Sequence, residues 1–177
     1  MPCARPPVAR QQRGEPRIKF MTPDAKYYRP CVAALIQNPA GLLLVAERRD
    51  FKNSWQFPQG GIDEGESARD ALVREMGEEL SLHKRDFSIL EERPGYRYEF
   101  PSKHRRWGKY LGQQQTYFRC QFLSSDDAIN LETAQPEFRR WKWIRPEEFN
   151  LKWLPEFKRR VYQQVMRDFF GLDLRDE

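Results

Sequence analysis

The segment between Gly60 and Leu82 constrains this sequence more than any other part of the chain. It begins with the pair Gly60-Gly61, which we predict to start a loop. Ser67 follows, and its position three residues before Asp70 resembles a capping box at a helix start. Apolar residues then recur at helical spacing, so we predict a helix from Ser67 to about Leu80.

Three glutamates fall on one face of this predicted helix. At about 100° per residue, Glu75, Glu78 and Glu79 lie within an arc of about 100° that borders the apolar stripe. Alanines share the arc, and no Lys or Arg lies on it to offset the charge. A solvated acidic face is the ordinary interpretation, but like charges at this spacing cost a few tenths of a kcal/mol each, roughly, and burial adds to that cost. Convergent carboxylates suit a hard divalent cation, for which we expect Mg²⁺, with Mn²⁺ as the alternative.

The same residues resemble a known motif. Gly60, Glu66 and the run Arg74-Glu75-Met76-Gly77-Glu78-Glu79 are similar in type and spacing to the Nudix box of pyrophosphohydrolases. The resemblance implies that Glu75, Glu78 and Glu79 bind the metal, that Gly60 approaches it, and that Glu66 and Arg74 brace the loop against the helix. Ser81 departs from the pattern, which has Gly. If this position needs a positive φ, Ser costs about 1 kcal/mol there.

The flanking residues are similar to one branch of that family, the bacterial RNA pyrophosphohydrolases and plant-type diadenosine tetraphosphate hydrolases. The similarity rests on Tyr28-Arg29-Pro30, residues 54–61, residues 112–115, Pro136-Glu137-Phe138 and residues 157–162. It implies that Glu137 is a fourth metal ligand facing the helix, that Arg49 and Phe157 sandwich the first base, and that Tyr98 lines the phosphate channel. Gln59, Gly61 and Lys158 complete the implied substrate contacts. Thr116 stands where the branch usually has Lys, which removes one expected phosphate contact.

Each implied substrate contact also has a simpler interpretation. Phe157 shares the apolar face of its helix and fits a core position. Arg49 fits an ordinary surface position, and Lys158 with Arg159 and Arg160 fits a solvated face as well as an RNA-backbone contact. The basic residues interleaved with aromatics in 101–115 fit either an RNA end or a plain surface loop.

The chemistry of the implied site is phosphoanhydride hydrolysis, in which charge neutralisation and placement of water do most of the catalysis. The resemblance implies that the catalytic carboxylates are Glu75, Glu78, Glu79 and Glu137, and we expect the general base to be one of the last three. The leading prediction is removal of pyrophosphate from 5′-triphosphorylated RNA to leave a 5′-monophosphate. The alternative substrate is a dinucleoside polyphosphate such as diadenosine tetraphosphate. A third interpretation is a non-hydrolytic module that binds RNA ends or nucleotides.

The remaining pattern predicts an α/β fold with a mixed sheet and helices on both faces, as in a Nudix α/β/α sandwich. Apolar runs at 31–36 and 42–46 flank turn residues and predict a hairpin. Further strands are expected at 55–57, 86–90, 96–100, 116–123 and 140–144, and a terminal helix from Pro155 to about Phe170.

Charge and cysteine content bound the rest of the interpretation. Residues 1–20 carry five cations and one Glu, so most of the net charge of +5 belongs to this segment. We expect 1–26 to be a disordered basic extension, with a nucleic-acid-binding arm or a targeting segment as alternatives, 27–172 to be the hydrolase domain, and 173–177 to be a tail. Three widely spaced cysteines suggest no disulfide framework and a reducing, cytoplasmic compartment. We expect no membrane association and a monomer.

Overall fold

The computed structural model describes residues 27–101 and 110–175. The predicted basic extension 1–26 and most of the predicted basic loop, residues 102–109, lie outside the described residues.

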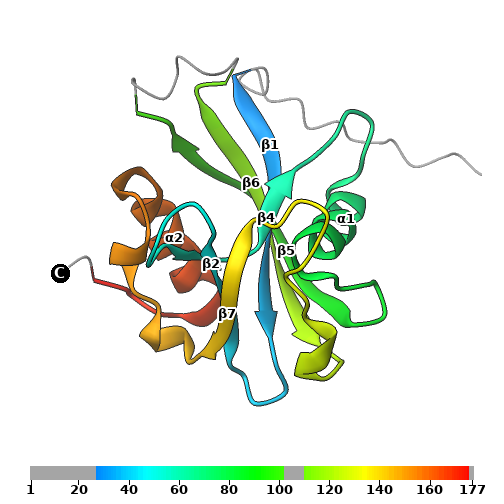
Figure 1. The fold of residues 1–177 in the computed structure, drawn as a ribbon. Helices are drawn as coiled ribbons and strands as arrows, with labels where there is room; N and C mark the ends of the chain where they lie inside the picture. Colours follow the sequence, from blue (N-terminus) through cyan, green and yellow to red (C-terminus); the bar gives the residue numbers. More distant parts are fainter. Residues whose placement is uncertain (1–26, 102–109, 176–177) are drawn as a thin grey trace, which may run out of the picture.

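A seven-stranded mixed sheet forms the centre of the molecule (Figure 1). Its main path runs β3-β2-β1-β6-β5, while β4 pairs with β1 and β7 pairs with β2. β1 and β6 are parallel, and the other described pairs are antiparallel. The strands are β1 (Tyr28–Gln37), β2 (Leu43–Arg48), β3 (Trp55–Gln56), β4 (Gln59–Gly61), β5 (Phe87–Glu99), β6 (Gly112–Phe122) and β7 (Phe138–Ile144).

Two helices cover the sheet from opposite sides, α1 (Ala68–Leu80) and α2 (Glu156–Phe170), as Figure 1 shows. The alternation of side chains along β1 produces two separate cores. Val32, Ala34 and Ile36 pack with α1, whereas Ala33 and Leu35 pack with α2. The predicted mixed sheet with helices on both faces is therefore confirmed. Short 3₁₀ turns at Asp126–Ala128, Pro146–Glu148 and Leu151–Trp153 complete the connections.

The predicted start of α1 is confirmed, and its end explains the unusual Ser81. The Ser67 side chain accepts a hydrogen bond from the Asp70 backbone N–H. Ser81 adopts the left-handed conformation with φ of 59°, so this position does require positive φ. Its hydroxyl donates to the Asn130 carbonyl at 3.0 Å, which offsets part of the strain.

The structure corrects three predicted elements. The expected strands 86–90 and 96–100 are one continuous strand, β5. The residues between them stay in the strand because two irregularities in its pairing with β6, near Ile89 and between Arg93 and Tyr96, accommodate the extra residues. β6 begins at Gly112 rather than Thr116. The predicted glycine loop contains β4, which pairs with Cys31–Ala33 of β1 and so fixes the backbone of Gly60 and Gly61 in the sheet.

No helix among the described residues is both long enough and apolar enough to cross a membrane.

Candidate active site

Arg74 ties the loop before α1 to the helix. Its guanidinium donates to both carboxylate oxygens of Glu66, at 2.9 and 2.8 Å, and to the Gly61 carbonyl at 2.8 Å. These hydrogen bonds hold the pKa of Glu66 below its ordinary value. The geometry agrees with the bracing role that the motif resemblance implies for this pair.

Arg74 also corrects the prediction that no cation offsets the acidic arc. The same guanidinium donates to Glu75 at 2.8 Å and to Glu78 at 3.3 Å. Helical position alone placed Arg74 off the arc, but its side chain is long enough to reach back across the helix surface. The charge of the arc is therefore partly compensated within the protein.

Gly60 lies directly against the Glu75 carboxylate. A Cβ at this position would stand 1.8 to 2.1 Å from the carboxylate atoms of Glu75, closer than any real contact. Glycine is thus required for Glu75 to reach the β4 backbone. At Gly61 a Cβ would meet the guanidinium of Arg29 at 2.3 Å, so Arg29 occupies the other side of this strand.

Glu79 is the most buried of the acidic residues on α1, with 3% of its surface exposed. Its Oε2 accepts a hydrogen bond from the Gln59 backbone N–H at 2.9 Å, whereas Oε1 is buried with no hydrogen-bond partner. Burial raises the pKa of Glu79 well above its ordinary value, and the charges of Glu137 and Glu75 raise it further. Burial also raises the pKa of Glu75. A buried carboxylate with an unpaired oxygen beside other carboxylates is an arrangement that a cation would stabilise.

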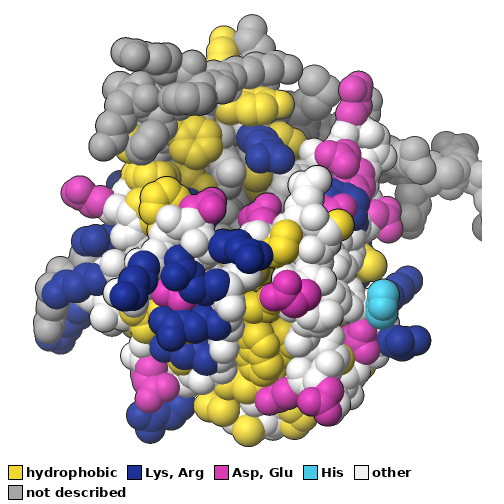
Figure 2. Space-filling model, viewed as in Figure 1, with side chains coloured by type: hydrophobic (Ala, Val, Ile, Leu, Met, Phe, Trp, Pro, Cys, Tyr) yellow, Lys and Arg dark blue, Asp and Glu magenta, His cyan; other side chains and the backbone are white. Residues whose placement is uncertain are grey.

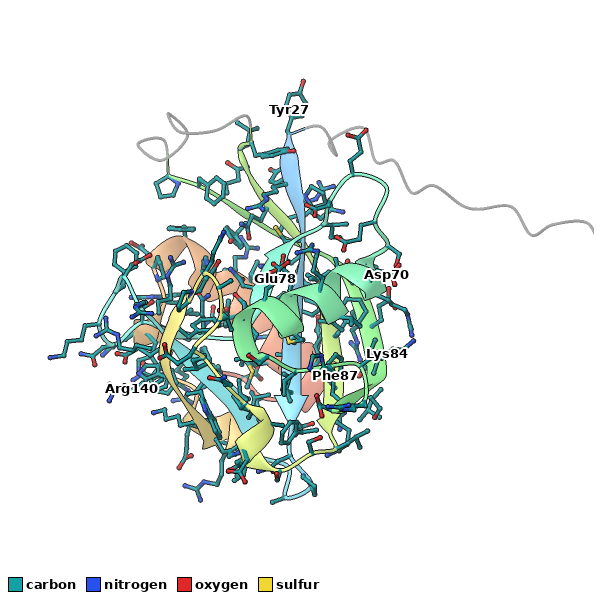
Figure 3. All side chains as sticks on the ribbon, turned by 45° about the vertical axis from the view of Figure 1, so that its right-hand side comes forward. Tyr27, Asp70, Glu78, Lys84, Phe87 and Arg140 are labelled. Atoms are coloured by element: carbon teal, nitrogen blue, oxygen red, sulfur yellow. The ribbon has the colours of Figure 1, made fainter. Side chains whose placement is uncertain are left out.

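The four predicted metal ligands therefore share one region. One cavity on the α1 side of the sheet is lined by Glu75, Glu78, Glu79 and Glu137. Figure 3 shows Glu78 near the middle of the molecule, whereas Asp70 lies at the outer end of the same helix. Within the described residues, no group of three acidic, histidine or cysteine side chains is already arranged to hold a metal ion. Arg74 engages Glu75 and Glu78, whereas the buried Glu79 Oε1 has no partner and would be satisfied by a cation.

An aromatic pocket of about 680 Å³ lies on the α2 side of these carboxylates. The Phe157 ring lies 5.7 Å from that of Tyr98 and 6.3 Å from that of Phe100. Gln59 lines the pocket and its backbone N–H donates to Glu79, so the pocket and the acidic site meet at this residue. The pocket is lined by Arg48, Phe51, Ser54, Gln56, Gln59, Tyr98, Phe100, Tyr110, Gln113, Trp153, Pro155, Phe157 and Lys158.

A chain of hydrogen bonds holds the polar wall of the pocket. Tyr98 donates to Gln113 at 2.5 Å, and the fully buried Gln115 donates to Gln59 at 2.7 Å. Tyr117 in turn donates to Gln115 at 2.8 Å. This network fixes Gln59 and Gln113 through side-chain hydrogen bonds within the protein, which pre-organises the pocket.

Lys158 does not lie on a solvated face. It has 8% of its surface exposed, lines the pocket, and places its ammonium 5.4 Å from the centre of the Tyr98 ring. Burial, together with the positive charge of Arg48, lowers its pKa to about 8. The ammonium is therefore charged at neutral pH and available to an anion in the pocket.

The remaining predicted site residues separate into those that the pocket includes and those that it does not. Phe157 and Tyr98 line it, but Arg49 does not, and Arg48 takes that place. Arg49 is exposed, its backbone N–H donates to the Glu137 carbonyl, and its own carbonyl accepts from Arg139. Thr116 is paired with Val32 of β1, outside the pocket lining.

Sequence reasoning missed several pocket residues, among them Arg48, Phe51, Gln113 and Trp153. Their signal was weak because Arg48, Phe51 and Trp153 are single residues at a strand end or in a connection, and Gln113 is one of three consecutive glutamines. The strongest indication in the sequence was the pair Arg48-Arg49 at the end of β2. Neighbouring residues of a strand face opposite sides, so the sequence did not show which of the two arginines faces the pocket.

Residues 27–165 match the NUDIX domain, and the chain belongs to the Nudix hydrolase family, which typically uses a divalent metal ion and acts on phosphoanhydride bonds. The chain is 41% identical over 157 residues to an RNA pyrophosphohydrolase from Dinoroseobacter shibae, covering 84% of this chain and 98% of the relative. It is 42% identical over 151 residues to an RNA pyrophosphohydrolase from Salmonella arizonae, covering 82% and 85%.

Solved structures share the fold. The MutT protein from Methanosarcina mazei superposes with a TM-score of 0.58 at 20% identity, covering 81% of this chain and 96% of that one. The predicted family and fold are confirmed by these matches.

Proposed function

We propose that this protein removes pyrophosphate from the 5′-triphosphate end of RNA, leaving a 5′-monophosphate, with Mg²⁺ as the metal. The observation that carries the proposal is the junction at Gln59, which joins an aromatic pocket suited to a base to a buried carboxylate site suited to metal-bound phosphates. Relatives at about 40% identity over most of the chain carry the name RNA pyrophosphohydrolase, in agreement with the leading prediction from the sequence.

The protein's own groups supply the binding steps. Phe157, with Tyr98 and Phe100 behind it, offers a ring on which a base stacks, and Arg48 lies in the same pocket. The Lys158 ammonium neutralises phosphate charge between the pocket and Glu79. Because Arg49 lies outside the pocket lining, we assign the arginine of the base site to Arg48 instead.

The carboxylates supply the metal ligands and the base. Glu75, Glu78, Glu79 and Glu137 would hold the metal, which neutralises the phosphates and lowers the pKa of water when bound. One carboxylate among Glu78, Glu79 and Glu137 takes a proton from the attacking water. The water oxygen bonds to phosphorus, the phosphoanhydride bond breaks, and pyrophosphate leaves. All groups come from one chain, so a monomer suffices.

The test compares substrates under matched conditions with Mg²⁺ and, separately, Mn²⁺. Purified protein receives 5′-triphosphorylated RNA or diadenosine tetraphosphate, and kcat/KM is measured for each, with Glu78→Gln as the blank. Preference for RNA with release of pyrophosphate supports the proposal. Preference for the dinucleotide assigns the pocket to dinucleoside polyphosphates instead. Binding without turnover of either substrate would indicate a binding module.

A further inference from the structure

A cationic surface on β2 and β7 adjoins the aromatic pocket. We infer that the single-stranded RNA downstream of the 5′ end leaves the pocket past Trp153 and lies along Arg140 and Lys142. We call this surface, formed by Trp55, Arg140, Lys142 and Trp153, the β7 track. The inference rests on the proposed function, since it assigns a path to the rest of the same substrate.

Strand register places the track on the pocket side of the sheet. Arg140 of β7 pairs with Glu47 of β2, and Glu47 pairs with Trp55 of β3. Residues that pair across neighbouring strands point to the same face. Trp55 and Ile144 belong to the core that contains α2, so Arg140 and Lys142 lie on the face that carries the pocket.

Arg140 is held in place and still presents most of its donors outward. Its Nε lies 2.6 Å from an oxygen of the fully buried Glu47, and Arg139 lies 3.7 Å from the same oxygen. The Arg140 side chain nevertheless remains 58% exposed. A guanidinium has five N–H donors, and Glu47 engages only the Nε edge, so the others are free to meet phosphate oxygens.

Lys142 connects Arg140 to the pocket through two tryptophans. Its ammonium lies 4.4 Å from the Trp55 ring centre and 4.7 Å from the Trp153 ring centre. The Arg140 guanidinium lies 5.1 Å from the Trp55 ring centre. Trp153 also lines the pocket, so the track and the base site share a wall. Trp55 is only 7% exposed and therefore supports the two cations, whereas the half-buried Trp153 can offer part of its ring to a base. Cations beside a partly accessible ring suit the phosphates and bases of single-stranded nucleic acid.

The charge balance of this surface favours a polyanion. Arg48, Arg139, Arg140, Lys142 and Arg145 share it with the carboxylates of Glu47, Asp50 and Glu148. Figure 2 shows Lys and Arg side chains gathered on this side of the molecule, over β2 and β7. Figure 3 shows Arg140 projecting from β7 at the edge of the molecule. The need to neutralise the buried Glu47 carboxylate accounts for the positions of Arg139 and Arg140. It does not account for Lys142, whose ammonium lies over the rings of Trp55 and Trp153.

A binding experiment tests the track without catalysis. A labelled 20-nucleotide RNA with a 5′-hydroxyl is titrated with the full chain across a range of salt concentrations, and its Kd is read by anisotropy. Lys142→Gln and Arg140→Gln together are expected to weaken binding by about five- to tenfold. They should also reduce the slope of log Kd against log salt by about 1.4, because each single-strand phosphate contact contributes about 0.7. The matched control removes two exposed charges elsewhere, Arg85→Gln with Arg167→Gln, and should leave both values unchanged.

A hydrolysis experiment then separates this inference from the proposed function. The ratio of kcat/KM for a 5′-triphosphorylated 20-mer to that for a 5′-triphosphorylated dinucleotide should fall by about the same factor in the double variant. Because Arg140→Gln removes a partner of buried Glu47, thermal unfolding is measured in parallel, and Lys142→Gln alone is the variant that keeps this ion pair.

The proposed RNA path along the β7 track would be overturned if folded Lys142→Gln and the folded double variant kept the wild-type RNA affinity and salt slope, even if RNA is hydrolysed. A normal track with no release of pyrophosphate from any RNA would instead overturn the proposed function.

Discussion

The Glu75 carboxylate lies so close to Gly60 that a Cβ there would stand 1.8 Å from Glu75 Cδ. Gly60→Ala must therefore move either β4 or Glu75. We expect it to reduce kcat/KM and metal affinity by about 100-fold, because a displaced ligand no longer reaches the ion. Steady-state kinetics and calorimetric metal titration would measure the two effects.

The matched control is Gly77→Ala on the same helix. Its Cβ would meet only the Leu82 carbonyl at 3.6 Å, an ordinary contact, so we expect a gain in stability of up to about 1 kcal/mol from helix propensity. Wild-type metal affinity in Gly60→Ala would show that Glu75 is not a ligand.

Glu79 makes the stability of the metal-free protein depend on pH. Its pKa in the folded state lies well above its ordinary value of 4.5, so the folded protein retains a proton that the unfolded chain has released. The stability associated with this group is complete below about pH 4.5 and is lost as the pH rises through the folded pKa. Metal-free protein should therefore become less stable as the pH rises above about 4.5 toward neutrality, and divalent ions should reverse the loss.

Thermal unfolding with and without Mg²⁺ across this range would measure the effect. Glu79→Gln should flatten the slope of the metal-free protein, whereas Glu64→Gln on the exposed loop should not. Carboxyls with lowered pKa, such as Glu47 and Glu66, act in the opposite direction but below about pH 4.5. A metal-free stability that increases as the pH rises above about 4.5 toward neutrality would contradict the assignment.

Phe157 lies on the boundary between the core and the pocket, so its replacement distinguishes the two roles. Loss of a stacked base costs about 1–3 kcal/mol, so Phe157→Ala should raise KM for RNA about tenfold or more. Phe169→Ala, on the same helix but 6% exposed in the core, should cost stability of about 3–5 kcal/mol with little change in KM. Kinetics and denaturant unfolding on both variants give the comparison. An unchanged KM together with a large loss of stability in Phe157→Ala would show that this residue packs in the core and does not stack on the base.

Ser81 carries backbone strain and a compensating hydrogen bond, and two substitutions separate them. Ser81→Gly releases about 1 kcal/mol of left-handed strain but loses the bond to Asn130, so its net effect should be within about 1 kcal/mol of zero. Ser81→Ala loses the bond and keeps the strain, so it should be about 1 kcal/mol less stable than Ser81→Gly. Denaturant unfolding measures the order, and equal stabilities would argue against strain at this position.

Local signals in the sequence predicted local structure well. The capping residue Ser67, the helical spacing after it and the turn between the first two apolar runs were sufficient for α1 and the β1–β2 hairpin. These features depend on residues close in the chain, whose geometry is dictated by backbone sterics and short-range hydrogen bonds.

Elements that depend on distant partners were harder to predict. β4 is a three-residue strand that exists because β1 offers it a ladder at Cys31–Ala33. β5 is continuous because pairing with β6 bridges its bulges. Neither pairing leaves a periodic trace in the strand's own sequence.

The motif residues on α1 and the acidic chemistry they imply could be read from the sequence, because one helix sets the spacing of Glu75, Glu78 and Glu79. The tertiary structure decided that Arg74 reaches two of them, that Glu79 is buried with an unpaired oxygen, and that Arg48 rather than Arg49 lines the pocket. It also brought Arg140 and Lys142 beside the pocket through the pairing of β7 with β2. Burial and contact between distant segments arise only when the sheet assembles, whereas the spacing on a helix is fixed by 3.6 residues per turn.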